Sequence, residues 1–158
     1  MTMGDMSAVL DQLADTPRFA REAFDSAPLD AWDSQVQGVQ FSMRQEMCHL
    51  RDVELEGHLV RVMRMAAERQ PLLTDLDGTQ MANERAYEMQ DPVAALRDFT
   101  ALRALTVARL RQLPPDAWSR TGMFSPDAAF DIRELTAMIR HHDEEHCDEI
   151  STLLAALR

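Results

Sequence analysis

The sequence has few of the residues that build sheets, tight turns and disulfide frameworks. Its 158 residues include five glycines, two cysteines and one tyrosine, and aromatic residues make up only 6%. This scarcity, beside many Ala, Leu, Met and Arg residues, favours helix over sheet. Cys48 and Cys147 are too few to form a disulfide framework, so we expect a reducing compartment.

Basic charge and long apolar runs are also scarce. The net charge of −11 argues against nucleic-acid partners and anionic membrane surfaces, which both require a basic face. No apolar run approaches the length of a membrane span, and residues 1–5 lack the basic and apolar regions of a signal peptide. We therefore expect a cytoplasmic protein, and we attribute the acidity to solubility.

Hydrophobic periodicity predicts one domain, residues 1–158, with an all-α fold. A chain of this length buries a core without disulfides, and four long helices in one domain predict a four-helix bundle. Pro17 is expected to kink or divide the first helix. A polar connection at 70–90 with a short helix at 81–89, and a loop at 122–127, separate the later helices. The four long helices are predicted at 7–26, 39–68, 92–113 and 127–157.

A short phrase occurs twice, 86 residues apart. Pro28-Leu29-Asp30-Ala31-Trp32 and Pro114-Pro115-Asp116-Ala117-Trp118 both read Pro-x-Asp-Ala-Trp, and each precedes a helix that carries histidine. The phrase is either an internal repeat, which indicates two helix pairs related by a pseudo-two-fold axis, or a coincidence of turn chemistry.

The last predicted helix has an apolar stripe that two histidines interrupt. Residues four apart on a helix lie about 40° apart around the axis and roughly 6 Å along it. His142 and His146 therefore continue the stripe toward the interior, whereas His141 lies on the opposite side and is expected to face solvent. The apolar members of the stripe are Ile132, Leu135, Ile139, Ile150, Leu153 and Leu157.

A third histidine, His49, lies on the second predicted helix, on the side that carries Val53, Val60 and Met63. If the two halves are related by a pseudo-two-fold axis, this helix faces the last one and three imidazoles meet in the interior. Three neutral imidazoles on rigid helices form a site for a divalent transition metal, with positions left for water or substrate. The alternative is that the histidines are core residues paired with carboxylates. His58 has no partner that the sequence identifies.

Several neighbouring polar residues have two interpretations each. Asp52 and Asp143 are candidates to orient a ring nitrogen, or they form salt bridges on helix faces. Glu145 and Glu149 are candidate acid/base groups, or they belong to a solvated face. Because sequence neighbours on a helix are turned by about 100°, the two cysteines next to these histidines are expected to pack as small apolar residues.

The segments Met43–Glu54 and His142–His146, each preceded by the Pro-x-Asp-Ala-Trp turn, resemble the DinB/YfiT-like metalloenzyme superfamily. The resemblance covers nearly the whole chain. It implies a four-helix bundle of up-down-down-up order with a long crossover between helices two and three. It also implies a metal held by His49, His142 and His146.

The same superfamily includes thiol-dependent enzymes, in which the metal is expected to activate the thiol of a small cofactor. The resemblance thus implies a metal-dependent thiol-S-transferase, or a related transferase or isomerase, that acts on small molecules and possesses a low-molecular-weight thiol as cofactor. Zinc, nickel and iron suit three imidazoles equally. Homodimerisation is a further expectation. The alternatives are a non-catalytic metal-binding stress-response bundle and a metal-free helical interaction module.

Overall fold

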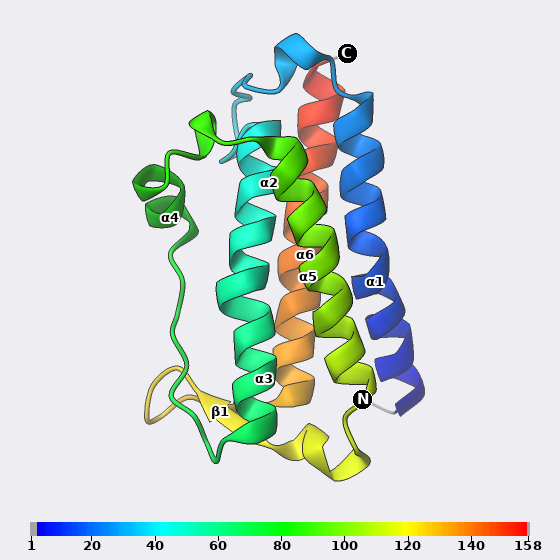
Figure 1. Cartoon of the computed structure of the whole chain (residues 1–158), viewed down its shortest axis with the longest axis vertical. Helices are drawn as coiled ribbons and strands as arrows, with labels where there is room; N and C mark the ends of the chain where they lie inside the picture. The colour runs from blue at the N-terminus through cyan, green and yellow to red at the C-terminus, as the bar shows by residue number, and fades with distance from the viewer. Residues whose placement is uncertain (1–2, 158) are drawn as a thin grey trace.

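The computed structural model describes residues 3–157 as long helices packed side by side (Figure 1). Residues 1–2, which belong to the segment predicted to lack a signal peptide, lie outside the described residues, as does residue 158. None of the described helices has the length and apolarity needed to cross a membrane. The helices of the bundle are α1 (Met3–Ser26), α2 (Met43–Asp52), α3 (Leu59–Ala67), α5 (Pro92–Arg111) and α6 (Ile132–Ala156).

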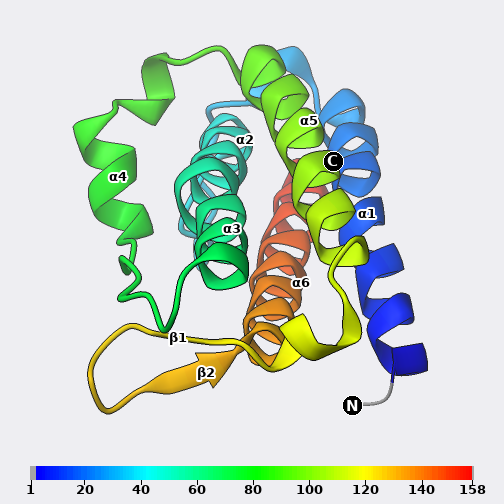
Figure 2. The same cartoon turned by 60° about the horizontal axis from the view of Figure 1, so that its bottom comes forward.

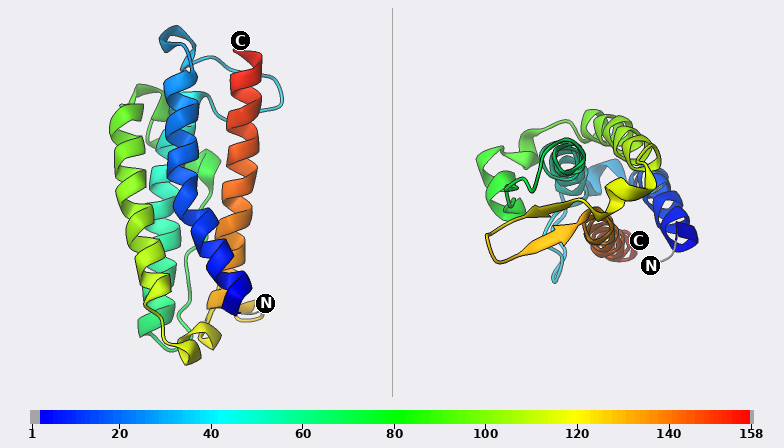
Figure 3. Two further views of the ribbon diagram at one scale, coloured as in Figure 1. Left: turned by 90° about the vertical axis from the view of Figure 1, so that its right-hand side faces the viewer. Right: turned by 90° about the horizontal axis from the view of Figure 1, so that it is seen from below.

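The chain follows the up-down-down-up path that the resemblance implied. In Figure 1, α1 rises, α2 and α3 descend as one rod, α5 descends again and α6 rises. Residues 68–91 form the crossover, which returns outside the bundle from the lower end to the upper end (Figure 2). α5 packs against α1 and α2, and α6 packs along α1, as the left view of Figure 3 shows. The predicted fold class is confirmed.

Capping side chains set the helix starts. The Ser42 side chain accepts from the backbone N–H of Gln45 and the Gln45 side chain accepts from that of Ser42, so α2 begins at Met43 and not at 39. Asp131 and Glu134 form the same arrangement at α6, which begins at Ile132 and not at 127. The predicted starts were early because the hydrophobic pattern continues through the preceding segments.

Pro17 neither ends nor divides α1, which is one continuous helix. Proline lacks the N–H that would bond to the carbonyl of Leu13, four residues earlier. The Nη1 of Arg103 on α5 donates to this carbonyl at 3.2 Å instead. The helix thus keeps its hydrogen bonding through a neighbouring helix.

The rod of α2 and α3 contains one π-helical segment, η2 (Val53–His58). A π segment adds one residue to a turn, so every later residue is rotated by about 100° relative to a regular helix. Val53 is buried, but Val60 and Met63 are 42% and 48% exposed. The prediction that these two share the inner side of His49 was therefore wrong. The residues buried beyond the segment are Leu59, Val62 and Met65.

The two predicted loops contain short elements. β1 (Thr121–Met123) and β2 (Ala129–Asp131) form an antiparallel hairpin, which the sequence did not predict. The crossover is attached to it, since the backbone N–H of Leu73 donates to the carbonyl of Met123 at 2.8 Å. The short helix predicted at 81–89 was misplaced: α4 (Gly78–Glu84) precedes a single 3-10 turn, η3 (Tyr87–Met89).

The repeated Pro-x-Asp-Ala-Trp phrase has the same local structure in both places. It forms the 3-10 turns η1 (Leu29–Ala31) and η4 (Pro115–Ser119), which lie at opposite ends of the bundle (Figure 1). The Trp32 ring packs on Phe24 with ring centroids 4.3 Å apart, and Trp118 is buried. Each turn reverses the chain between two antiparallel helices, as the predicted pseudo-two-fold relation requires.

The core consists of two apolar clusters with a polar layer between them. The upper cluster includes Phe24, Met47 and Phe99, and the lower one includes Leu13 and Leu110. The layer that separates them contains residues of α1, α2, η2, α5 and α6. Its buried or partly buried members are Thr16, His49, Glu54, His58, Arg103, Thr106, His142, Asp143 and His146.

Candidate metal centre

Three histidines predicted to meet do lie together in the polar layer. His49 comes from α2, and His142 and His146 come from successive turns of α6. The Nε2 atoms of His49 and His142 are 3.2 Å apart, and one ring nitrogen from each of the three residues lies within 4.8 Å of the others. His141 is 71% exposed at its side chain and lies 3.4 Å from Glu145, so the predicted division between inner and outer histidines is confirmed.

Burial keeps two of these imidazoles neutral at pH 7. The His49 ring is 5% exposed, and burial, followed by the nearby charges of His146 and His142, lowers its pKa to about 2. Burial likewise lowers the pKa of His142 to about 4. The Nδ1 atoms of both rings are buried without a hydrogen-bond partner. Neutral imidazoles are the form that binds metals, so the protonation states suit a metal centre.

Glu46 is a buried carboxylate that the sequence did not single out. Its Oε2 lies 2.9 Å from Nδ1 of His146, and the side chain has no exposed surface. A carboxylate that accepts the Nδ1 proton directs Nε2 of the same ring toward a metal. Burial raises the pKa of Glu46 to about 7. Burial lowers the pKa of His146, but the hydrogen bond to Glu46 outweighs burial, so the pKa of His146 is raised overall. The position of Glu46, three residues before His49, is the only sequence signal for this role.

The two aspartates for which the sequence left open a ring-orienting role or a salt bridge are both paired with arginine. Asp52 accepts from Arg51, Arg85 and Tyr87 at 2.7–2.9 Å, so its salt-bridge interpretation is confirmed and its ring-orienting interpretation was wrong. These contacts hold the end of the crossover against α2, because Arg85 and Tyr87 lie in the last part of that segment. Asp143 lies 3.9 Å from Nδ1 of His142, beyond hydrogen-bond distance.

The remaining candidates are two glutamates and the two cysteines, and they lie at different distances from the imidazoles. Glu145 is 62% exposed and pairs with His141, which places it on the solvated face. Glu149 lies 3.5 Å from Nδ1 of His146, at the edge of the group. Burial raises the pKa of the Cys48 thiol to about 11 and that of Cys147 to about 12. Both thiols are therefore protonated at neutral pH, and Cys48 packs in the upper cluster.

Beneath the imidazoles, Arg103 joins two buried carboxylates. Its Nε donates to Glu54 at 2.9 Å and its Nη2 donates to Asp143 at 2.9 Å. Glu54 also accepts from Nδ1 of His58 at 3.1 Å, and the edge of the His58 ring meets His142 with centroids 5.0 Å apart. The partner of His58 is thus Glu54, which the π segment brings onto the inner face. This network fixes the surroundings of His142.

The three histidines lie at the wall of a cleft of about 340 Å³ between η2, α3, α6 and the crossover. Gly78 of α4 packs against the His49 ring, since a Cβ atom at this position would lie 2.6 Å from Cε1 of the imidazole. Glycine here lets the crossover cover His49 closely. The imidazoles are consequently reached through the cleft, which is large enough for a small ligand.

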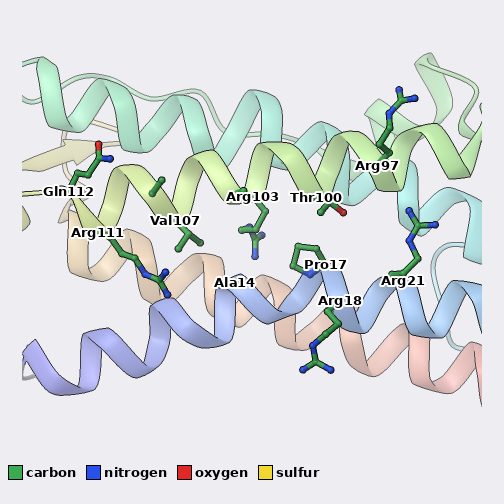
Figure 4. Close-up of a pocket in the computed structure, with 12 residues that line it drawn as sticks. Ala14, Pro17, Arg18, Arg21, Arg97, Thr100, Arg103, Val107, Arg111 and Gln112 are labelled. Carbon is green, nitrogen blue, oxygen red and sulfur yellow. The ribbon is translucent and has the colours of Figure 1, made fainter.

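A larger cavity of about 780 Å³ lies between α1 and α5 (Figure 4). Its floor is made of small and apolar side chains, including Ala14, Pro17 and Val107, and it contains none of the imidazoles. Arginines line it as well. They are Arg18, Arg21, Arg97, Arg103 and Arg111.

The fold and the site together define a four-helix bundle with a three-histidine candidate metal centre. Residues 12–150 match the DinB superfamily, and the chain belongs to this family. The family that the sequence motifs resemble is therefore confirmed. A search of curated proteins found no match.

Two solved structures share the fold. The structure of YfiT from Bacillus subtilis, described as a probable metal-dependent hydrolase with an unusual four-helix bundle topology, has a TM-score of 0.87 and 18% identity. That match covers 97% of this chain and 87% of YfiT. The mycothiol-dependent maleylpyruvate isomerase has a TM-score of 0.70 and 14% identity, and the match covers 95% of this chain but 63% of the isomerase.

Proposed function

We propose that this protein binds a divalent transition metal through His49, His142 and His146, and that it transfers a small-molecule thiol to an electrophile. The observation that supports the proposal is the convergence of three imidazoles, two of them kept neutral by burial, at a cleft. A catalytic metal site has three protein ligands and one open position. Zinc, nickel and iron all suit these ligands.

A bound divalent metal would supply Lewis acidity, which lowers the pKa of a thiol at the open position. The residues of the chain do the rest. Glu46 orients the His146 ring, and the Arg103 network holds the surroundings of His142 in place. Cys48 and Cys147 keep their protons and lie outside the group, so the reacting thiol comes from a small molecule.

Turnover assays test this proposal directly. Metal-loaded protein is mixed with glutathione, cysteine, mycothiol or bacillithiol and with 1-chloro-2,4-dinitrobenzene, in which a carbon–sulfur bond forms and chloride and the thiol proton leave. We expect one thiol to react with wild type and with His141→Ala, but not with His142→Ala. The absence of turnover with every thiol and with further electrophiles would contradict thiol transfer.

The likeness to YfiT favours metal-dependent hydrolysis as a second candidate function, because that match covers most of both chains. A panel of ester and amide substrates, assayed without thiol, separates the two. Hydrolysis that needs His142 would replace thiol transfer as the assigned reaction. A stoichiometric metal without either activity would favour the non-catalytic metal-binding bundle, and protein free of metal would favour the interaction module.

The cellular setting and the assembly also belong to the proposal. Cys48 and Cys147 are free, which supports a reducing, cytoplasmic location. We expect a small molecule as the main partner and a homodimer in solution. Light scattering of the purified protein at several concentrations tests the dimer.

A further inference from the structure

The cleft that exposes the imidazoles has one cationic side chain in its wall, Arg61 of α3. The side chain is only 12% exposed, and its Nε is buried without a hydrogen-bond partner. Asp75 is the one carboxylate among the other described residues of the wall, and apolar side chains form much of the rest. They include Val53, Leu76, Leu135, Met138 and Ile139.

Two uncharged groups contact the Arg61 guanidinium. The Cζ atom lies 4.8 Å from the centre of the Phe124 ring, and Nη2 donates to the carbonyl of Thr74 at 2.8 Å. Among the described residues, one carboxylate approaches within 4.0 Å: Asp75 Oδ1 at 3.8 Å from Nη2, with its side chain 88% exposed. Such an exposed and distant partner compensates a buried charge poorly.

Arg103 shows what a compensated buried arginine looks like in this protein. It is 1% exposed, and two buried carboxylates, Glu54 and Asp143, bind it directly. The Arg61 side chain is 12% exposed and has no such partner, although the chain has 27 acidic and 16 basic residues. A buried cation that is oriented from behind and faces a cleft is the arrangement that binds an anionic ligand.

We infer that Arg61 binds a carboxylate of the substrate whose other end lies at the three imidazoles. This inference rests on the proposed function for the identity of that other end. The substrate class is a small carboxylic acid with a short apolar spacer, because apolar side chains line much of the cleft that contains both Arg61 and the imidazoles. Arg61 is thus a specificity-determining residue, and the planar guanidinium suits a carboxylate.

Calorimetric titration of zinc-loaded protein tests the inference without any turnover. The probes are malonate, succinate, glutarate and adipate, each compared with its monomethyl ester, which keeps one carboxylate and loses the other. We expect wild type to bind the diacid of the right length about 10- to 100-fold more tightly than its ester. Arg61→Gln is expected to abolish this preference, and Arg61→Lys to retain part of it.

Arg64→Gln is the matched control. Arg64 lies one turn along α3 and also donates to a carbonyl of the crossover, that of Leu72 at 2.8 Å, but it pairs with Glu68 and does not line the cleft. We expect this variant to keep the preference for the diacid. Equal losses in Arg61→Gln and Arg64→Gln would overturn the inference, because they would trace the effect to the crossover.

Two further results would also overturn it: no preference for a diacid in wild type at any length, or an unchanged preference in Arg61→Gln. Metal content equal to that of wild type and an unchanged unfolding temperature show that the variant is intact. Failure of the thiol assay leaves this test standing, because diacid binding is measured without thiol. The two proposals can therefore fail separately.

Discussion

The cleft at the imidazoles and the cavity between α1 and α5 differ in whether their polar side chains already have partners. The cavity is the larger of the two, at about 780 Å³ against 340 Å³ for the cleft. Its arginines are already paired: Arg111 with Asp11 at 2.6 Å, and Arg97 with Asp98 at 2.9 Å. The cleft instead holds buried nitrogens without partners. Unsatisfied polar atoms, and not empty space, mark the position where a ligand completes the structure.

The largest effect is expected when one of the three imidazoles is removed. His142→Ala should lower the metal content from about one equivalent to nearly none, because two imidazoles remain where three are needed. Elemental analysis of protein purified without added metal measures this. His141→Ala, on the outer face of the same helix, should leave the content unchanged, and an equal loss in both variants would refute the assigned ligands.

The next largest effect concerns the buried and the exposed arginines that line the cavity between α1 and α5. Arg103→Met should destabilise the fold by about 3–5 kcal/mol, because it leaves Glu54 and Asp143 buried and unpaired. Arg97→Met, on the exposed rim, should change stability by less than about 0.5 kcal/mol. Urea unfolding compares them. Similar values for the two variants would show that the polar layer is not a coupled network.

The polar layer should also make stability depend on acid pH. Burial alone raises the pKa of Glu54, but Arg103 and then His58 outweigh it and hold the pKa at about 2, below the ordinary 4.5. The ionised carboxylate therefore stabilises the fold above pH 4.5, and this contribution, about 3 kcal/mol, is lost as the pH falls toward 2. Unfolding in urea at pH 5 and pH 3 measures the slope. Glu54→Gln should flatten it, Glu145→Gln should not, and identical slopes in all three proteins would contradict the assignment.

The smallest effect is expected at the carboxylate behind the metal centre. Glu46→Gln should weaken metal binding about 10- to 100-fold, because a neutral amide orients and polarises the His146 ring less well. Competition with a chelator of known affinity measures the change. Glu145→Gln is again the control, since that carboxylate pairs with His141 outside the site. An unaltered affinity in Glu46→Gln would limit the carboxylate to a packing role.

The regular helix α6 and the interrupted rod of α2, η2 and α3 differ in how well the sequence predicts their buried faces. On α6 the apolar stripe and its interruption by His142 and His146 were readable, because the helix is regular over its whole length. On the rod of α2, η2 and α3 the same reasoning failed after Val53, because one additional residue in η2 rotates all later positions. Val60 and Met63 consequently point outward, and His58 was left without its partner.

The same limit applies to groups that matter only through a distant neighbour. Glu46 and Arg103 look like ordinary surface residues of amphipathic helices, since charged side chains rarely become fully buried unless they are paired. Their partners lie on other helices, His146 for Glu46 and Asp143 for Arg103. No periodicity within one helix indicates such a pairing.

The sequence by itself determined the helical class, the inward direction of His142 and His146 and the outward direction of His141, because helical periodicity is a local property of the chain. Tertiary structure alone decided which carboxylates face which cations and where the cleft opens. It also decided that, among the described residues, the one carboxylate within 4.0 Å of Arg61 is the exposed Asp75, whereas Arg103 binds two buried carboxylates. These outcomes depend on the packing of helices far apart in the sequence, through which burial and charge pairing act together.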